Sequence, residues 1–176
     1  MIIWSIMNTE RRMEVIMFKV GDKIVYPMHG AGIIEAIEHK ELMGSDKEFY
    51  ILKLPIKNMK VMIPIDNAEG LGVRKVVDQI IFNDVIDLLG QNKEVMPDNW
   101  NRRYRSNMEK VKTGDIFEVA KVVRNLEILD KEKGLSTGER KMLSNTKQIL
   151  VSELTLSKDL KEEEVVSLVN ATIGSH

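Results

Sequence analysis

The sequence predicts an α+β fold in which a small N-terminal β-barrel precedes a compact, all-α C-terminal domain of about five helices. Two observations support this prediction. Between Phe18 and Gly72, short segments rich in Val, Ile and aromatic residues alternate with turn residues, a pattern typical of strands. After Arg74, apolar residues recur every three or four positions, which is the period of an amphipathic helix. The chain therefore changes character near residue 73.

Four or five strands are expected in the first part of the chain. The clearest segments span residues 23–26, 32–37, 49–54 and 60–64. Turns that contain Gly and Asp separate them, as connections between short strands require. A flat sheet of such short strands would bury too little apolar surface, so we expect a curled, SH3-like barrel.

The helical part begins with apolar positions over 76–89, a pattern that allows a break near Phe82-Asn83. A polar loop over 91–97 follows. Residues that favour helix caps and helix ends mark the later boundaries: Asp98 or Asn99, Thr113-Gly114, Asp115, Gly134 and the Ser136/Glu139 pair, with a last helix over 158–172.

The chain is predicted to have three parts. Residues 1–16 precede the β-pattern and match neither domain, so we expect them to be a disordered extension. Residues 17–72 form the β-domain, and residues 73–176 form the helical domain.

Composition limits the classes of function. The chain has 176 residues, of which 43% are hydrophobic, and it has no cysteine, which excludes disulfides and thiolate metal sites. The apolar run over 1–7 is too short to span a bilayer. A net charge of −1 gives no overall attraction to nucleic acid, so any DNA binding must come from a local patch. We expect a monomeric cytoplasmic protein with no membrane role.

Sequence features of an enzyme are weak. The chain contains no phosphate-binding G-x-x-x-x-G-K-[ST] motif and no H-E-x-x-H motif, and its three histidines are scattered. We therefore expect no catalytic residue, no metal site and no cofactor.

The most informative segment is 97–105, in which Trp100 stands near an expected helix start and arginines follow it. Between Trp100 and Lys112 there are five basic residues and one acidic residue, a net charge of +4. A large apolar ring beside fixed positive charge suits contact with distorted DNA. The alternative is a tryptophan that packs against a neighbouring helix, beside a solvated basic face.

Several motifs, in the same order along the chain, resemble the CarD/CdnL family of bacterial transcription regulators. They are Lys19-Val20-Gly21-Asp22, Val25-Tyr26-Pro27, His29-Gly30-Ala31-Gly32, the segment 64–72, Asn99-Trp100-Asn101-Arg102-Arg103-Tyr104, and Gly134-Leu135-Ser136 with Glu139. The resemblance runs from about Met17 to the C-terminus and leaves out the first 16 residues.

The resemblance implies a two-part mechanism. The N-terminal domain would be the Tudor-like module that is also found in transcription-repair coupling factors, and it would dock on the β subunit of RNA polymerase. The helical domain would contact promoter DNA beside the −10 element, at the upstream edge of the bubble, and stabilise the open complex, commonly at ribosomal RNA promoters. The protein would then be associated with the nucleoid through polymerase.

The resemblance also implies which residues make these contacts. Trp100 corresponds by position to the family tryptophan that sits in the minor groove. The expected DNA-binding set is Trp100, Arg102, Arg103, Arg105 and Lys110. The polymerase contacts are expected near 38–41 and 60–63, and the predicted residues are Glu38, Lys40, Lys60 and Met62. Lys40 and Met62 stand where relatives can carry arginine, so main-chain pairing at a sheet edge would have to supply part of the contact.

Two other functions remain open at this point. A small-barrel factor that binds RNA, such as a translation-associated protein, would need an aromatic platform, for which Tyr26, Phe49 and Tyr50 are available. A module that docks on polymerase without touching DNA would not need Trp100.

Overall fold

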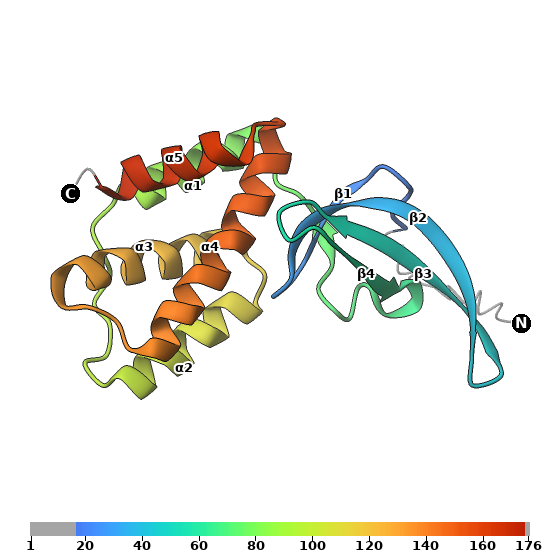
Figure 1. Cartoon of the computed structure of the whole chain (residues 1–176), viewed down its shortest axis with the longest axis horizontal. Coiled ribbons are helices and arrows are strands. Elements are labelled where there is room, and N and C mark those ends of the chain that lie inside the picture. The colour runs from blue at the N-terminus through green and yellow to red at the C-terminus, as the bar shows by residue number, and fades with distance from the viewer. Residues whose placement is uncertain (1–16, 175–176) are drawn as a thin grey trace, which may run out of the picture.

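The computed structural model describes residues 17–174. The expected extension over 1–16 lies outside the described residues. A curved antiparallel sheet occupies one end of the molecule and five helices occupy the other (Figure 1). The predicted α+β class is confirmed.

The sheet has five strands in the spatial order β4-β3-β2-β1-β5, with every neighbouring pair antiparallel. The strands are β1 (Lys23–Tyr26), β2 (Gly30–Leu42), β3 (Ser45–Leu54), β4 (Met59–Pro64) and β5 (Arg74–Lys75). A short 3-10 turn, η1 (Ile65–Asn67), follows β4. The strand β5 lies beyond residue 72 and pairs with β1, so the sheet continues past the predicted domain boundary.

The hairpin of β2 and β3 is longer than the sequence pattern predicts. Its ladder continues outward to the pair Leu42 and Ser45. Met43 and Gly44 form the connection, both with positive φ, at 52° and 77°, as tight hairpin turns require. The outer part of the hairpin is exposed and extends away from the body of the molecule (Figure 1). Because neither face of this part is buried, the apolar alternation that marks a strand is missing there.

The core of the sheet domain contains Ile24, Ile34, Leu52 and Ile63, all with essentially no exposed surface. Tyr50 lies among them, and its hydroxyl accepts a hydrogen bond from the backbone N–H of Phe18 at 3.0 Å. Phe49 is also buried. Two of the three aromatic residues that an RNA-stacking platform would use are therefore core residues.

Five helices follow the sheet: α1 (Gln79–Leu89), α2 (Trp100–Lys112), α3 (Ile116–Lys133), α4 (Thr137–Lys158) and α5 (Glu162–Gly174). The break that the pattern allowed near Phe82-Asn83 is wrong, because α1 is continuous. Asp78 caps it by accepting from the N–H groups of Ile80 and Ile81. The Ser136/Glu139 capping box of α4 is confirmed. This helix ends at Asp159, which adopts a left-handed conformation with φ of 53°.

The helical core lies around α3 and α4, where Leu126, Leu150 and Leu154 have no exposed surface. Val165 and Val169 of α5 pack on the same cluster. Within residues 17–174, no helix is both long enough and apolar enough to cross a membrane.

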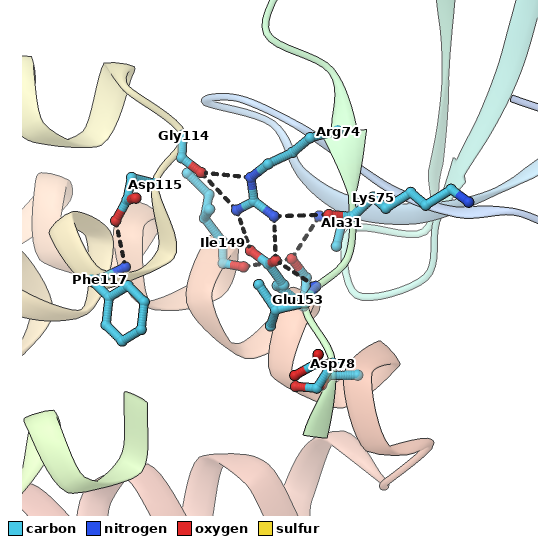
Figure 2. A network of polar contacts seen from close by, with 12 residues as sticks. Ala31, Arg74, Lys75, Asp78, Gly114, Asp115, Phe117, Ile149 and Glu153 are labelled. Atoms are coloured by element: carbon cyan, nitrogen blue, oxygen red, sulfur yellow. Dashed lines mark hydrogen bonds and ion pairs between the residues drawn. The ribbon is translucent and has the colours of Figure 1, made fainter. Parts of the chain in front are cut away.

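Arg74 joins the sheet to the helices (Figure 2). Its guanidinium forms a two-pronged ion pair with Glu153 of α4, with Nη1–Oε1 and Nη2–Oε2 distances of 2.6 and 2.9 Å. The same group donates to the carbonyl oxygen of Gly114, between α2 and α3, at 2.7 and 3.1 Å. On the sheet side, the N–H of Ala31 donates to Ser152 Oγ at 2.8 Å. These contacts hold the sheet at one position against α4 and the α2–α3 turn.

Candidate functional site

Trp100 is the first residue of α2, and half of its surface is exposed. Asn99 caps this helix, because its Oδ1 accepts from the N–H of Arg102 at 3.1 Å. Trp100 is on the same face of α2 as the buried residues Asn107 and Val111. It is nevertheless half exposed, because it is the first residue of the helix. The ring is therefore held at the surface by the start of a helix that is otherwise anchored.

Arg102 and Arg105 lie three residues apart on the exposed side of α2. Among residues 17–174, neither side chain is in an ion pair, and neither makes a hydrogen bond. Their charges are thus available to an external anion near the start of α2, on the side of the helix away from its buried positions.

Two further basic residues of α2, the predicted Lys110 and also Lys112, form ion pairs within the protein. Lys110 is half-buried and pairs with Glu94 at 3.0 Å. Lys112 pairs with Glu109 at 3.1 Å. The net charge of +4 in the sequence is therefore concentrated, in the folded protein, in Arg102 and Arg105.

Arg103 does not belong to the DNA-facing set that the sequence predicted. Only 5% of it is exposed, and its Nε donates to the carboxylate of Glu139, at 2.6 Å. Its Nη1 donates to the carbonyl oxygens of Pro97 and Asp98 at 2.9 and 3.1 Å. Arg103 shares a helical face with the buried positions Asn107 and Val111, and that spacing was the signal in the sequence that could have excluded it.

Glu139 is fully buried. The sequence identified it as part of a capping box and of the motif that it forms with Gly134-Leu135-Ser136. Burial alone raises the pKa of its carboxyl group. Hydrogen bonds from Arg103 and from the hydroxyl and backbone N–H of Ser136 outweigh burial, so the pKa lies below the ordinary value of 4.5. The folded protein therefore contains an ionised interior carboxylate at neutral pH.

The lowered pKa of Glu139 predicts a loss of stability in acid. Its pKa is lower in the folded state than in the unfolded state, so its stabilisation is complete above pH 4.5 and is lost as pH falls through the folded pKa. Glu139→Gln should cost about 1–3 kcal/mol at pH 7 and should make the free energy of unfolding less dependent on pH below 4.5. Urea unfolding at pH 7 and at about pH 3 measures both effects.

Glu118→Gln is the matched control, because Glu118 forms only a partly exposed pair with Lys121 one turn away on the same helix. It should change the free energy of unfolding by less than about 1 kcal/mol. An unchanged acid dependence in Glu139→Gln would show that this carboxylate is not the group that titrates.

The four predicted polymerase contacts lie together on one face of the sheet. Glu38 and Lys40 are in β2, and Lys60 and Met62 are in β4. Lys40 Nζ lies 3.4 Å from Glu38 Oε2 and 3.4 Å from the sulfur of Met62. The strand β4 is at the edge of the sheet, so its outward N–H and C=O groups can pair with a strand of a partner.

Glu35 also belongs to this face, and sequence reasoning missed it. It lies at an irregularity in the pairing of β2 with β3, between Ile34 and Ala36. Its carboxylate pairs with Lys60 at 2.5 Å. Nothing in the local sequence marks a β-bulge at this position, so the alternation of strand residues could not place Glu35 there.

The sequence also contains a short motif typical of some hydrolases, which the sequence analysis missed. Residues 134–138 have the G-x-S-x-G spacing of some hydrolases. In the structure, Ser136 is the N-cap of α4, and its hydroxyl donates to Glu139 Oε2 at 2.7 Å. The segment follows a helix instead of a strand, so it lacks the setting of a nucleophile elbow and forms a helix cap.

Two family models match the chain. The CarD-like/TRCF RID domain matches residues 18–77, and the CarD C-terminal domain matches residues 84–170. The chain is 42% identical over 153 residues to YdeB of Bacillus subtilis (strain 168), named as a candidate transcription factor, and the match covers 86% of this chain and 99% of YdeB. The solution NMR structure of the 72-residue N-terminal domain of Myxococcus xanthus CarD is 34% identical, covers 34% of this chain and 79% of that chain, and has a TM-score of 0.30.

Proposed function

Because the chain belongs to the CarD family of transcription regulators, we propose that it stabilises the open promoter complex by binding the β subunit of RNA polymerase and promoter DNA at once. The sheet binds polymerase, and the start of α2 binds DNA at the upstream edge of the bubble, near the −10 element. The observation that carries the proposal is the half-exposed Trp100 at the start of α2, with two unpaired arginines in the first two turns of the same helix. Arg74 ties the turn after this helix to the sheet.

In this proposal, Trp100 acts as a wedge. Apolar side chains that enter the minor groove hold base steps that are already unstacked or bent. The edge of an opening bubble offers such a step, so the ring stabilises the open form over the closed duplex. Arg102 and Arg105 contact phosphates on either side of that step and carry no base preference.

The arginines alone would bind DNA weakly. Two or three phosphate contacts give a salt slope of roughly −2 to −3 and a non-specific dissociation constant of about 10⁻⁴ to 10⁻⁶ M. Docking of the sheet on polymerase raises the effective DNA concentration to roughly millimolar. This exceeds the weakest expected dissociation constant by about tenfold, so docking makes the weak contact sufficient.

The combined variant Arg102→Glu/Arg105→Glu should weaken binding to bubble DNA at every sequence tested. Two phosphate contacts are lost, so the slope of log affinity against log salt should fall in magnitude by about 2. Fluorescence anisotropy titrations at several salt concentrations measure it. A changed sequence preference would show that these residues read bases. Lys131→Glu, in the last turn of α3, is the control, and its slope should match that of the parent.

Polymerase docking is tested with the full chain. Lys40→Glu/Lys60→Glu reverses two charges on the sheet face that contains β4 and should reduce capture of purified polymerase by roughly tenfold, equivalent to about 1.4 kcal/mol. Circular dichroism checks that the fold is retained. Full capture by this variant would show that the polymerase-binding site lies elsewhere. Capture without the β subunit would refute the proposed partner.

A further inference from the structure

Trp100 stands at the first position of α2, and an irregular segment over 91–99 precedes it. The rest of the protein covers only half of its surface. The buried attachment of this first turn is the side chain of Arg103, three residues along the same helix, which is 5% exposed. The position of the ring thus depends on what fixes this turn.

Arg103 connects three parts of the helical domain. Its Nε is bonded to Glu139 in the first turn of α4. Its Nη1 is bonded to the carbonyl oxygens of Pro97 and Asp98, which directly precede the cap of α2. Glu139 is held in turn, because its Oε2 accepts from the backbone N–H and the hydroxyl of Ser136 at 3.1 and 2.7 Å. One continuous set of charged hydrogen bonds therefore runs from the start of α4 to the segment that leads into Trp100.

Stability alone is a poor explanation for this pair. Replacing a buried ion pair with apolar residues of similar volume is often neutral or stabilising. An apolar pair at these positions could fill the same space, but it could not bond the carbonyl oxygens of Pro97 and Asp98. Only the arginine can attach the segment before α2 to the rest of the domain in this way.

We propose that Arg103 and Glu139 are positioning residues that fix the ring of Trp100 for insertion into DNA. This inference rests on the proposed DNA contact of Trp100. Arg103 itself touches no phosphate, and it acts by holding residues 97–100 against the start of α4. Loss of the pair leaves the fold in place and releases the ring.

Trp100 can report on its own mobility. The chain has two tryptophans, Trp4 and Trp100, so Trp4→Phe leaves Trp100 as the single reporter. In that background, Arg103→Met/Glu139→Met should retain the helical circular dichroism signal and lower the fluorescence anisotropy of Trp100. Acrylamide quenching should increase by roughly twofold. Affinity for bubble DNA should fall roughly five- to tenfold, the lower range for loss of an aromatic stacking contact.

Two further variants separate positioning from other causes. Arg103→Lys keeps the charge but offers a single ammonium in place of the guanidinium fork, so it should restore part of the anisotropy. Lys112→Met removes a charge from the same helix at an exposed pair and should leave the anisotropy of Trp100 unchanged. If the double variant does not fold, Arg103→Lys is compared with the parent, and its anisotropy should be measurably lower.

The outcomes distinguish this inference from the proposed function. The anisotropy of Trp100 is measured without DNA. An unchanged anisotropy in the folded double variant overturns the positioning role. If only Arg103→Lys folds, an unchanged anisotropy in that variant does the same. If Trp100→Ala leaves DNA affinity intact, the proposed function fails even where the anisotropy falls. Lower anisotropy together with weaker DNA binding supports both.

Discussion

Trp100→Ala is expected to reduce the lifetime of the open promoter complex to the value measured without the protein, while binding to polymerase is unchanged. The variant removes the exposed ring at the start of α2 and leaves the sheet untouched. Stacking of an aromatic ring on a base is worth about 1–3 kcal/mol, which corresponds to a roughly 5- to 150-fold change in lifetime. Dissociation of open complexes, measured after addition of a competitor, gives the lifetime.

Trp100→Phe is the matched control. It keeps an apolar ring of smaller area, so its lifetime should lie between those of the parent and the alanine variant. An unchanged lifetime for Trp100→Ala would contradict the wedge role. It would instead favour a protein that acts only by docking on polymerase.

Arg74→Met is expected to cost about 3 kcal/mol of unfolding free energy and to free the helices from their fixed position against the sheet. Glu153 is 4% exposed on its side chain, so the variant leaves a buried carboxylate without its charge partner. The expected cost is at the low end for a broken buried pair, because 31% of the Arg74 side chain is exposed. Urea unfolding measures this cost.

The change in domain position can be measured separately. The chain has no cysteine, so spin labels can be attached at Ser45→Cys, beside the hairpin turn, and Ser106→Cys, on the exposed side of α2. Arg74→Met should broaden the distribution of distances between the two labels, whereas Lys75→Met, at an exposed neighbour, should leave it narrow. A narrow distribution in Arg74→Met would show that the remaining contacts, such as Ala31 to Ser152, hold the sheet without it.

The expected consequence for initiation follows from the geometry. If sheet and helices move independently, the effective concentration of α2 at the bubble falls. Arg74→Met should therefore shorten the open-complex lifetime even though Trp100 and the polymerase-binding face are intact.

Much of the fold could be predicted because its signals are local. The strand β1 and the caps of α2, α3 and α4 depend on residues within one turn of each other, such as Ser136 and Glu139. The outer part of the β2–β3 hairpin could not be predicted, because it has no buried face and hence no apolar alternation. The length of this hairpin depends on backbone pairing, which does not require a particular pattern of side chains.

The candidate site divides in the same way. The sequence by itself determined that an apolar ring and a basic run stand together near a helix start at Trp100, and that the chain resembles one family of transcription regulators. Only the tertiary structure decided which charges of that run remain available. Arg102 and Arg105 face solvent, while Arg103 is turned inward to Glu139, 36 residues away. The reason is physical: the charge of a residue is a property of its type, but its burial and its partner depend on which helix packs against it.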